Sequence, residues 1–144
     1  MLSASNLRLS SRLPRLTSSF APSPIRIATF STTQIKMSVQ AITSYEDFQK
    51  IINGDKIAAI DFWATWCGPC KMISPLFEKF ANDAPADQIA FYKVDVDEQE
   101  QISQEVGITA MPTFVFFKNG QKITQTVGAN PQQLQAAIKQ VVSA

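Results

Sequence analysis

Short, strongly apolar runs that alternate with helix-like segments constrain the fold of this chain more than any other feature. The clearest run, Ile57–Trp63, reads IAAIDFW, and such near-continuous apolar character is typical of a strand buried on both faces of a sheet. Three further runs of similar length predict three more strands. They are expected at 89–94, Thr113–Lys118 and 122–127.

The first helical signal precedes the Ile57–Trp63 run. Thr43 and Glu46 form a capping box, and the apolar residues that follow recur at helical spacing. This helix is predicted to end near Asn53 and Gly54.

Three more helices are predicted after that run. One follows Cys70 and contains Pro75, which should kink it. A short one spans 98–106 with Gly107 as its C-terminal cap, and the last runs to about residue 142. The last helix is expected to start with Asn130 as cap and Pro131 at its first position.

The order of these elements predicts the sheet. Asn119-Gly120 between the last two strands is a strong hairpin signal, because both residues accept a positive φ. The hairpin is antiparallel, and strands joined by helices are expected to pair in parallel. The predicted fold class is therefore α/β, with a mixed central sheet covered by helices on both faces.

Residues 1–36 differ in composition from the rest of the chain. They hold eight Ser, four Thr, four Arg and no acidic residue, which is typical of a mitochondrial transit presequence. We expect this segment to be disordered and cleaved between residues 27 and 37, leaving a domain at 37–144 in the mitochondrial matrix. A basic tail without an address and a chloroplast address are the alternatives. Met37 is a possible second start that would give a cytosolic form.

Charge and hydropathy exclude two classes of partner. Five of the thirteen basic residues precede Glu46, the first acidic residue, so eight basic and twelve acidic residues belong to the remaining chain. This mildly acidic domain has no basic patch for nucleic acid. No apolar run is long enough to cross a bilayer, so no membrane insertion is expected.

The chain has two cysteines, Cys67 and Cys70, and no histidine. The absence of histidine excludes a Cys–His protease pair, a Ser–His–Asp triad and histidine-ligated zinc. A structural disulfide is disfavoured because so short a loop constrains the unfolded chain very little. Half of a four-cysteine zinc site shared by two chains is a further alternative, although no other residue is placed to bind a metal.

The sequence Trp66-Cys67-Gly68-Pro69-Cys70 follows a buried strand and opens a helix. Free backbone N–H groups and the helix dipole at this position stabilise a thiolate at Cys67. Cys70 is one helical turn further on, where it can close a disulfide. We therefore expect Cys67 to attack a substrate disulfide and Cys70 to resolve the mixed disulfide, with Pro69 fixing the backbone between them.

Asp61 is a carboxylate inside an otherwise apolar predicted strand. Burial of a carboxylate raises its pKa, so Asp61 is a candidate proton carrier. A core carboxylate paired with a cation and without a catalytic role is the alternative.

Several motifs resemble those of the thioredoxin family in order and spacing, over essentially all of residues 37–144. They are Asp61-Phe62-Trp63-Ala64, Trp66-Cys67-Gly68-Pro69-Cys70-Lys71, Pro75, Lys93-Val94-Asp95, Met111-Pro112-Thr113, Phe117-Lys118-Asn119-Gly120 and Val127-Gly128. The resemblance implies the thioredoxin fold, reduction of protein disulfides and cell redox homeostasis. It also implies partners, namely client proteins with disulfides and an NADPH-dependent thioredoxin reductase, with no cofactor or metal bound to the chain itself and a monomeric state.

The resemblance also implies roles for individual residues. Asp61 would accept the proton of Cys70, and Lys93 would lie near it. Pro112 would form a cis peptide bond beside the cysteines and, with Met111, present backbone to an extended peptide. The remaining substrate-binding surface would comprise Trp66, Gly68, Pro69, Ala110 and Gly128, where Ala110 replaces the glycine often found at its position.

Two other functions fit the same fold. A disulfide oxidase or isomerase is disfavoured because oxidants of this fold usually carry a histidine between the cysteines, where this chain has Gly68-Pro69. A redox-silent binding module is disfavoured because both cysteines are present. Activity assays of cysteine variants would separate these functions from the reductase.

Overall fold

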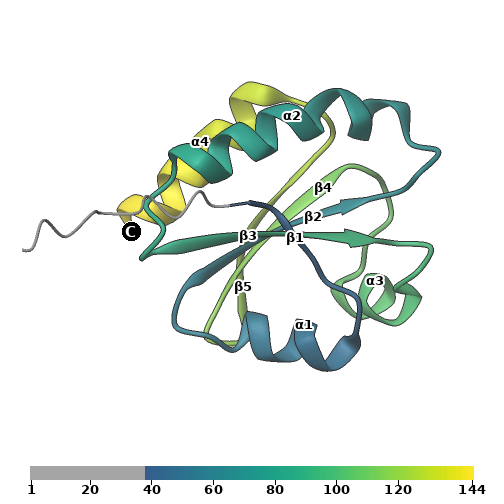
Figure 1. The fold of residues 1–144 in the computed structure, drawn as a ribbon, viewed down its shortest axis with the longest axis horizontal. Helices are drawn as coiled ribbons and strands as arrows, with labels where there is room; N and C mark the ends of the chain where they lie inside the picture. Colours follow the sequence, from purple (N-terminus) through teal and green to yellow (C-terminus); the bar gives the residue numbers. More distant parts are fainter. Residues whose placement is uncertain (1–37) are drawn as a thin grey trace, which may run out of the picture. The chain divides into compact units, whose positions relative to one another are not determined.

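The computed structural model describes residues 38–144, so the predicted presequence at 1–36 and the possible start at Met37 lie outside the described residues. The described part forms one five-stranded sheet with four helices (Figure 1). The elements are β1 (Gln40–Ala41), α1 (Tyr45–Ile52), β2 (Ile57–Trp63), α2 (Gly68–Asp83), β3 (Ile89–Asp95), α3 (Glu100–Val106), β4 (Thr113–Lys118), β5 (Gln121–Val127) and α4 (Pro131–Ser143).

The sheet has the strand order β1-β3-β2-β4-β5 and is mixed, as predicted. β3 is parallel to both β1 and β2, whereas β4 is antiparallel to β2 and to β5. The expectation that helix-linked strands run parallel is wrong for β3 and β4, which lie on opposite sides of β2 and run in opposite directions. The segment that contains α3 brings the chain back to the end of the sheet where β3 stops. β4 therefore starts at that end, beside the last residues of β2, and runs antiparallel to β2.

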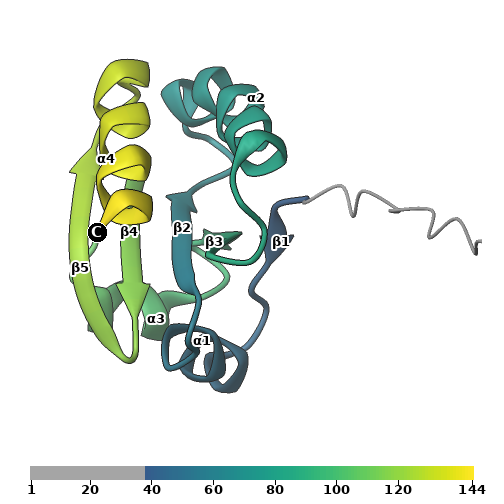
Figure 2. The same cartoon turned by 90° about the vertical axis from the view of Figure 1, so that its left-hand side faces the viewer.

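Helices cover both faces of the sheet, which Figures 1 and 2 show from two directions. α2 and α4 pack on one face in a core that includes Phe77, Phe91 and Phe114. α1 and α3 pack on the other face around Phe48 and Phe62. Consecutive residues of a strand point to opposite faces. Both clusters take alternate residues of β2, which explains why its sequence is apolar throughout.

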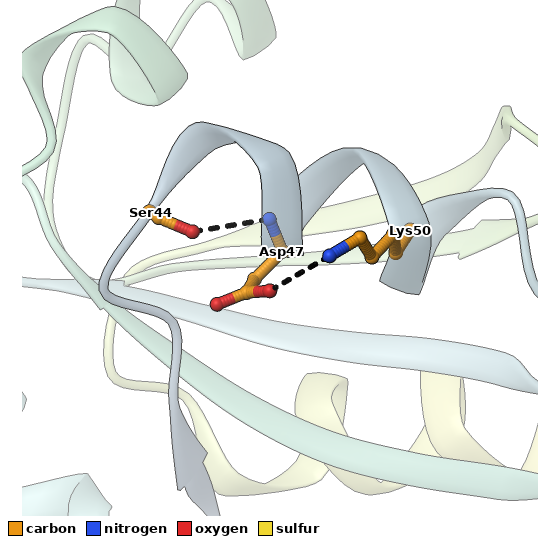
Figure 3. Close-up of polar contacts among 3 residues, drawn as sticks. All are labelled: Ser44, Asp47 and Lys50. Atoms are coloured by element: carbon orange, nitrogen blue, oxygen red, sulfur yellow. Dashed lines mark hydrogen bonds and ion pairs between the residues drawn. The ribbon is translucent and has the colours of Figure 1, made fainter.

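The start of α1 differs from the prediction. Ser44, and not Thr43, is the N-cap, and its Oγ accepts a 3.1 Å hydrogen bond from the backbone N–H of Asp47 (Figure 3). Lys50 forms an ion pair of 3.5 Å with Asp47 on the exposed side of the helix. The helix therefore begins one residue later than predicted, and it buries Phe48 and Ile52 against the sheet.

Strand β1 was not predicted from the sequence. It has only two residues, both exposed, and it exists because Gln40 and Ala41 pair with Tyr92 and Lys93 of β3. No apolar pattern marks such a strand, since its partner comes from a distant part of the chain.

The predicted turns and caps are confirmed. Gly107 ends α3 in the left-handed conformation with φ 78°, and Asn130 caps α4. Asn119 and Gly120 both have positive φ between β4 and β5. The backbone N–H of Gly120 also donates a 2.7 Å hydrogen bond to Ile52 O, which ties the hairpin to the end of α1. None of the helices in residues 38–144 is long and apolar enough to span a bilayer.

Candidate active site

The two cysteines lie where β2 gives way to α2. Cys67 is the N-cap of α2, and its Sγ accepts a 3.2 Å hydrogen bond from the backbone N–H of Cys70. The two residues form a disulfide with their Cα atoms 5.4 Å apart. Free N–H groups at the first turn of a helix favour negative charge, and no acidic residue in this turn opposes it. The site can therefore stabilise a thiolate at Cys67 when the disulfide is reduced.

The two sulfur-bearing residues are unequally accessible. Cys67 is 5% exposed and Cys70 is fully buried, and both pack with Ala64 in one small apolar cluster. Gly68 and Pro69, the first two residues of α2, are exposed. A partner that approaches the site thus meets Cys67 before Cys70.

The turn before β4 brings a second segment to the disulfide. Met111 packs against the cluster that contains both cysteines, and the Met111–Pro112 peptide bond is cis, as the resemblance implied. The backbone N–H of Gly128 donates a 2.7 Å hydrogen bond to Pro112 O, which fixes this turn to the end of β5. Ala110 is exposed, and its carbonyl oxygen accepts a 2.7 Å hydrogen bond from Thr113 Oγ1.

Trp66 is not a core residue. Its side chain is 66% exposed, and its indole Nε1 donates a 2.9 Å hydrogen bond to Asp97 Oδ2. Asp97 was missed from the sequence. The available signal was positional, because Trp66 follows β2, Asp97 follows β3, and the carboxyl ends of neighbouring parallel strands meet at one edge of a sheet.

Asp61 lies in the middle of the sheet, between Lys93 on β3 and Phe114 on β4. It is 3% exposed, and its Oδ1 accepts no hydrogen bond from any group in the described residues. Burial raises the pKa of Asp61 to about 7, against the opposing attraction of the Lys93 charge. The raised pKa predicted from the sequence is confirmed, and the group can exchange a proton near neutral pH.

Lys93 is half-buried beside Asp61. Its Nζ lies 5.7 Å from the centre of the Trp63 ring, and the two neighbours Lys93 and Asp61 form no direct ion pair. The cation therefore acts on Asp61 through space and not through a hydrogen bond. The salt-bridged pair considered from the sequence is not observed.

Comparison with known proteins decides the family. The thioredoxin family model matches residues 39–140. A thioredoxin from Malassezia sympodialis is 67% identical over 102 residues, which cover 71% of this chain and 97% of that protein. The chain belongs to the thioredoxin family.

Solved thioredoxin structures agree with the fold described above. A crystal structure of Malassezia sympodialis thioredoxin matches with a TM-score of 0.71 and 66% identity, over 74% of this chain and 92% of that one. The oxidised form of mitochondrial thioredoxin 3 from Saccharomyces cerevisiae matches with a TM-score of 0.66 and 42% identity, over 71% of this chain and 94% of that one. The predicted thioredoxin fold is thereby confirmed.

Membership of the family also gives the activity. This thioredoxin is a protein disulfide reductase, and Cys67–Cys70 is its active-site disulfide. The prediction of a reductase is confirmed, and the structure shows the oxidised half of its catalytic cycle.

Proposed function

We propose that Cys67 is the attacking residue of this thioredoxin and that Cys70 resolves the mixed disulfide. The observation that carries the proposal is the position of Cys67 as the N-cap of α2, with Cys70 fully buried behind it. Only the first of these sulfurs has both a stabilised anion and a route to a client.

The reaction consists of two thiol–disulfide exchanges. In the first, the Cys67 thiolate bonds to one sulfur of the client disulfide, and the other client sulfur leaves as a thiolate and takes up a proton. In the second, Cys70 loses its proton and bonds to Cys67 Sγ, and the remaining client sulfur leaves. Two electrons have passed to the client, and the protein returns to the Cys67–Cys70 disulfide.

Asp61 is proposed as the acceptor of the Cys70 proton. A carboxylate whose pKa lies at about 7 is matched to proton transfer at neutral pH. Lys93 favours the charged form of Asp61 and so sets how readily it takes up that proton.

The client is proposed to bind across the edge of the sheet around Cys67. Seven residues form this surface in the proposal: Trp66, Gly68, Pro69, Ala110, Met111, Pro112 and Gly128. The cis bond before Pro112 and the bond from Gly128 to its carbonyl shape a short stretch of backbone beside the disulfide. An extended client segment would pair with this backbone as a strand does.

Reducing equivalents are proposed to come from NADPH through a thioredoxin reductase, because the reaction consumes two electrons and no cofactor is proposed for the chain itself. The reductase and disulfide-containing proteins are the proposed partners, and neither nucleic acid nor membrane insertion has a part. The protein is proposed to act as a monomer.

Mitochondrial import is proposed from the composition of residues 1–36, followed by removal of this segment and action of the domain at 37–144 in the matrix. The similarity to a mitochondrial yeast thioredoxin supports this location. N-terminal sequencing of the mitochondrial and cytosolic forms tests both the cleavage and the use of Met37 as a start.

The decisive experiment compares two cysteine variants in insulin reduction and in trapping. Cys70→Ser should accumulate disulfide-linked clients that are resolved on non-reducing gels, since the second exchange is blocked. Cys67→Ser is the matched control and should capture none, because it lacks the attacking sulfur. Equal trapping by both variants would contradict the assignment of the two roles.

A further inference from the structure

A groove of about 490 Å³ lies between the last turns of α2 and α4. The two helices run side by side on one face of the sheet (Figures 1 and 2). The groove is about three turns of α2 away from Cys67, and its volume is in the range of small-molecule sites. It is therefore a candidate binding site that is separate from the disulfide.

The floor of this groove is apolar. Phe80 and Ala84 contribute to it from α2, Ile138 and Val142 from α4, and Pro85 extends it where α2 ends. Ile138 is buried, whereas the other four are only half-buried and leave part of their surface to the groove. Covering exposed apolar surface is favourable, so the floor favours a ligand with an apolar body.

Two lysines line the groove, one from each helix. α2 and α4 start at the same end of the sheet, where β2 and β5 stop, and so run in the same direction. Lys79 and Lys139 each lie about one turn before the last residue of their helix, which brings them to a similar level. Neither forms an ion pair within residues 38–144. Two unpaired ammonium groups at one level can hold a single carboxylate between them.

The charges beyond the lysines limit the ligand to one negative charge. Asp83 also lines the groove, one turn after Lys79 on α2, and it pairs with neither lysine. The last carbonyl groups of both helices carry partial negative charge at the same end. A second negative charge, as in a dicarboxylate or a phosphate monoester, is therefore disfavoured.

We propose that this groove binds a medium-chain fatty acid, with its carboxylate between Lys79 and Lys139 and its alkyl chain on the apolar floor. The charge of the ligand follows from the lysines and Asp83, and its apolar chain follows from the floor. The inference goes beyond disulfide reduction and does not rest on the proposed roles of Cys67 and Cys70.

The probe is decanoate, which is titrated into the oxidised full chain while the backbone amides are followed by NMR. The amide signals of Phe80, Ala84 and Val142 should shift and saturate together, which gives the Kd. Octanoate should bind more weakly and dodecanoate more tightly, by about two- to fourfold for each methylene, because the floor covers the chain. An affinity independent of chain length would contradict contact with the floor.

Two lysine variants test the position of the carboxylate. Lys79→Gln and Lys139→Gln should each raise the Kd of decanoate about two- to fivefold, the effect of losing one solvent-exposed ion pair. Decanol has the same chain without the charge, so both variants should bind it as the parent does. Lys118→Gln is the matched control, since Lys118 is exposed at the end of β4 and does not line the groove.

A variant of the floor tests the position of the chain. Val142→Ser should raise the Kd of decanoate and of decanol by similar factors, because it removes apolar surface and no charge. Val142 is half-buried in the last turn of α4, so the fold should tolerate the change. Insulin reduction should be equally fast with and without decanoate, since the groove is remote from Cys67.

Four results would overturn the proposal. Shifts that do not saturate, or that are confined to the basic segment 1–36, would show that the groove is empty. An equal rise of Kd in Lys118→Gln would show that the charge effect is general. Inhibition of insulin reduction by decanoate would place the ligand on the client surface. Sedimentation of the parent with phosphatidylglycerol vesicles, lost in both lysine variants, would assign the groove to a membrane surface instead of a free fatty acid.

Discussion

The Trp66 indole is held by Asp97, whose Oδ2 accepts its N–H at 2.9 Å, although the two residues are 31 positions apart. Asp97 is itself oriented, because its backbone N–H donates a 3.0 Å hydrogen bond to Asp95 Oδ1. An exposed aromatic ring next to Cys67 is therefore fixed in one direction instead of rotating freely. A fixed aromatic surface loses less conformational entropy when a client binds than a mobile one.

Removing this hydrogen bond should weaken client binding more than stability. In Asp97→Ala the Trp66 ring is released, so KM for insulin should rise several-fold while kcat changes little. The free energy of unfolding should fall by less than about 1 kcal/mol, since the bond is solvent-exposed. Glu98→Ala removes a neighbouring exposed carboxylate and is the control. Equal KM values for the two variants would contradict the role assigned to Asp97.

The raised pKa of Asp61 makes stability depend on pH. The group has a pKa of about 7 in the folded protein against 3.8 for a solvated aspartate, so folding favours its neutral form. Its contribution is fully present below the unfolded value and is lost as pH rises toward 7. About three pKa units correspond to a loss of up to about 4 kcal/mol above pH 7.

Asp61→Asn keeps a neutral side chain at every pH. Chemical denaturation of the oxidised protein at pH 4, 6 and 8 should show that the variant gains stability relative to the parent as pH rises. The difference should level off above pH 7. A difference independent of pH would show that the carboxylate is not destabilised by burial.

The hairpin between β4 and β5 should not accept a side chain at its glycine. Gly120 has φ 76°, a conformation that residues with a Cβ atom rarely adopt, and a Cβ atom there would also displace the Asn53 side chain, whose Oδ1 would lie 2.5 Å away. Gly120→Ala should therefore lower the free energy of unfolding by about 1–3 kcal/mol. Gly68→Ala is the control for stability, because a Cβ there meets nothing within 4 Å and φ is not positive. Similar losses in the two variants would refute the steric argument.

The core beneath α2 should be sensitive to truncation. Phe77 is 1% exposed, and its ring centre lies 5.2 Å from those of both Phe91 and Phe114. Phe77→Ala should cost about 3–5 kcal/mol in thermal or urea unfolding. Met72→Ala, on the same helix but with the residue 82% exposed, should change stability by less than about 0.5 kcal/mol. A small loss for Phe77→Ala would mean that the neighbouring rings close the cavity.

Apolar runs and turn residues in the sequence predicted those elements that depend on neighbouring residues alone. β2 and β4 have the bounds read from their apolar runs, and Gly107 and Asn119-Gly120 adopt the positive φ that their residue types allow. The pairing of β4 with β2 and the existence of β1 were not predictable in this way. Both depend on which strand lies beside which, and that is decided by packing of the whole chain.

The same division holds for the site. Cys67 and Cys70 are adjacent in a short motif, and the raised pKa of Asp61 follows from a carboxylate within an apolar strand. The bond from Trp66 to Asp97 and the placing of Ser74 beside Asp61 required the fold, because each joins residues from different elements. Neither pair is marked by a short-range pattern.

The direction of the outer elements has a practical consequence for reporters and tags. β1 is parallel to β3 and lies beside Tyr92 and Lys93 in the middle of that strand, so the described chain starts before the end of the sheet where β2 stops and Cys67 lies. β5 ends beside the start of β4, at the end of the sheet where Cys67 lies. From there α4 leads to Ala144 (Figure 1). A fluorescent protein or surface anchor fused after Ala144 would thus be tethered remote from the disulfide, and immobilised protein should turn over insulin at the rate of the free form.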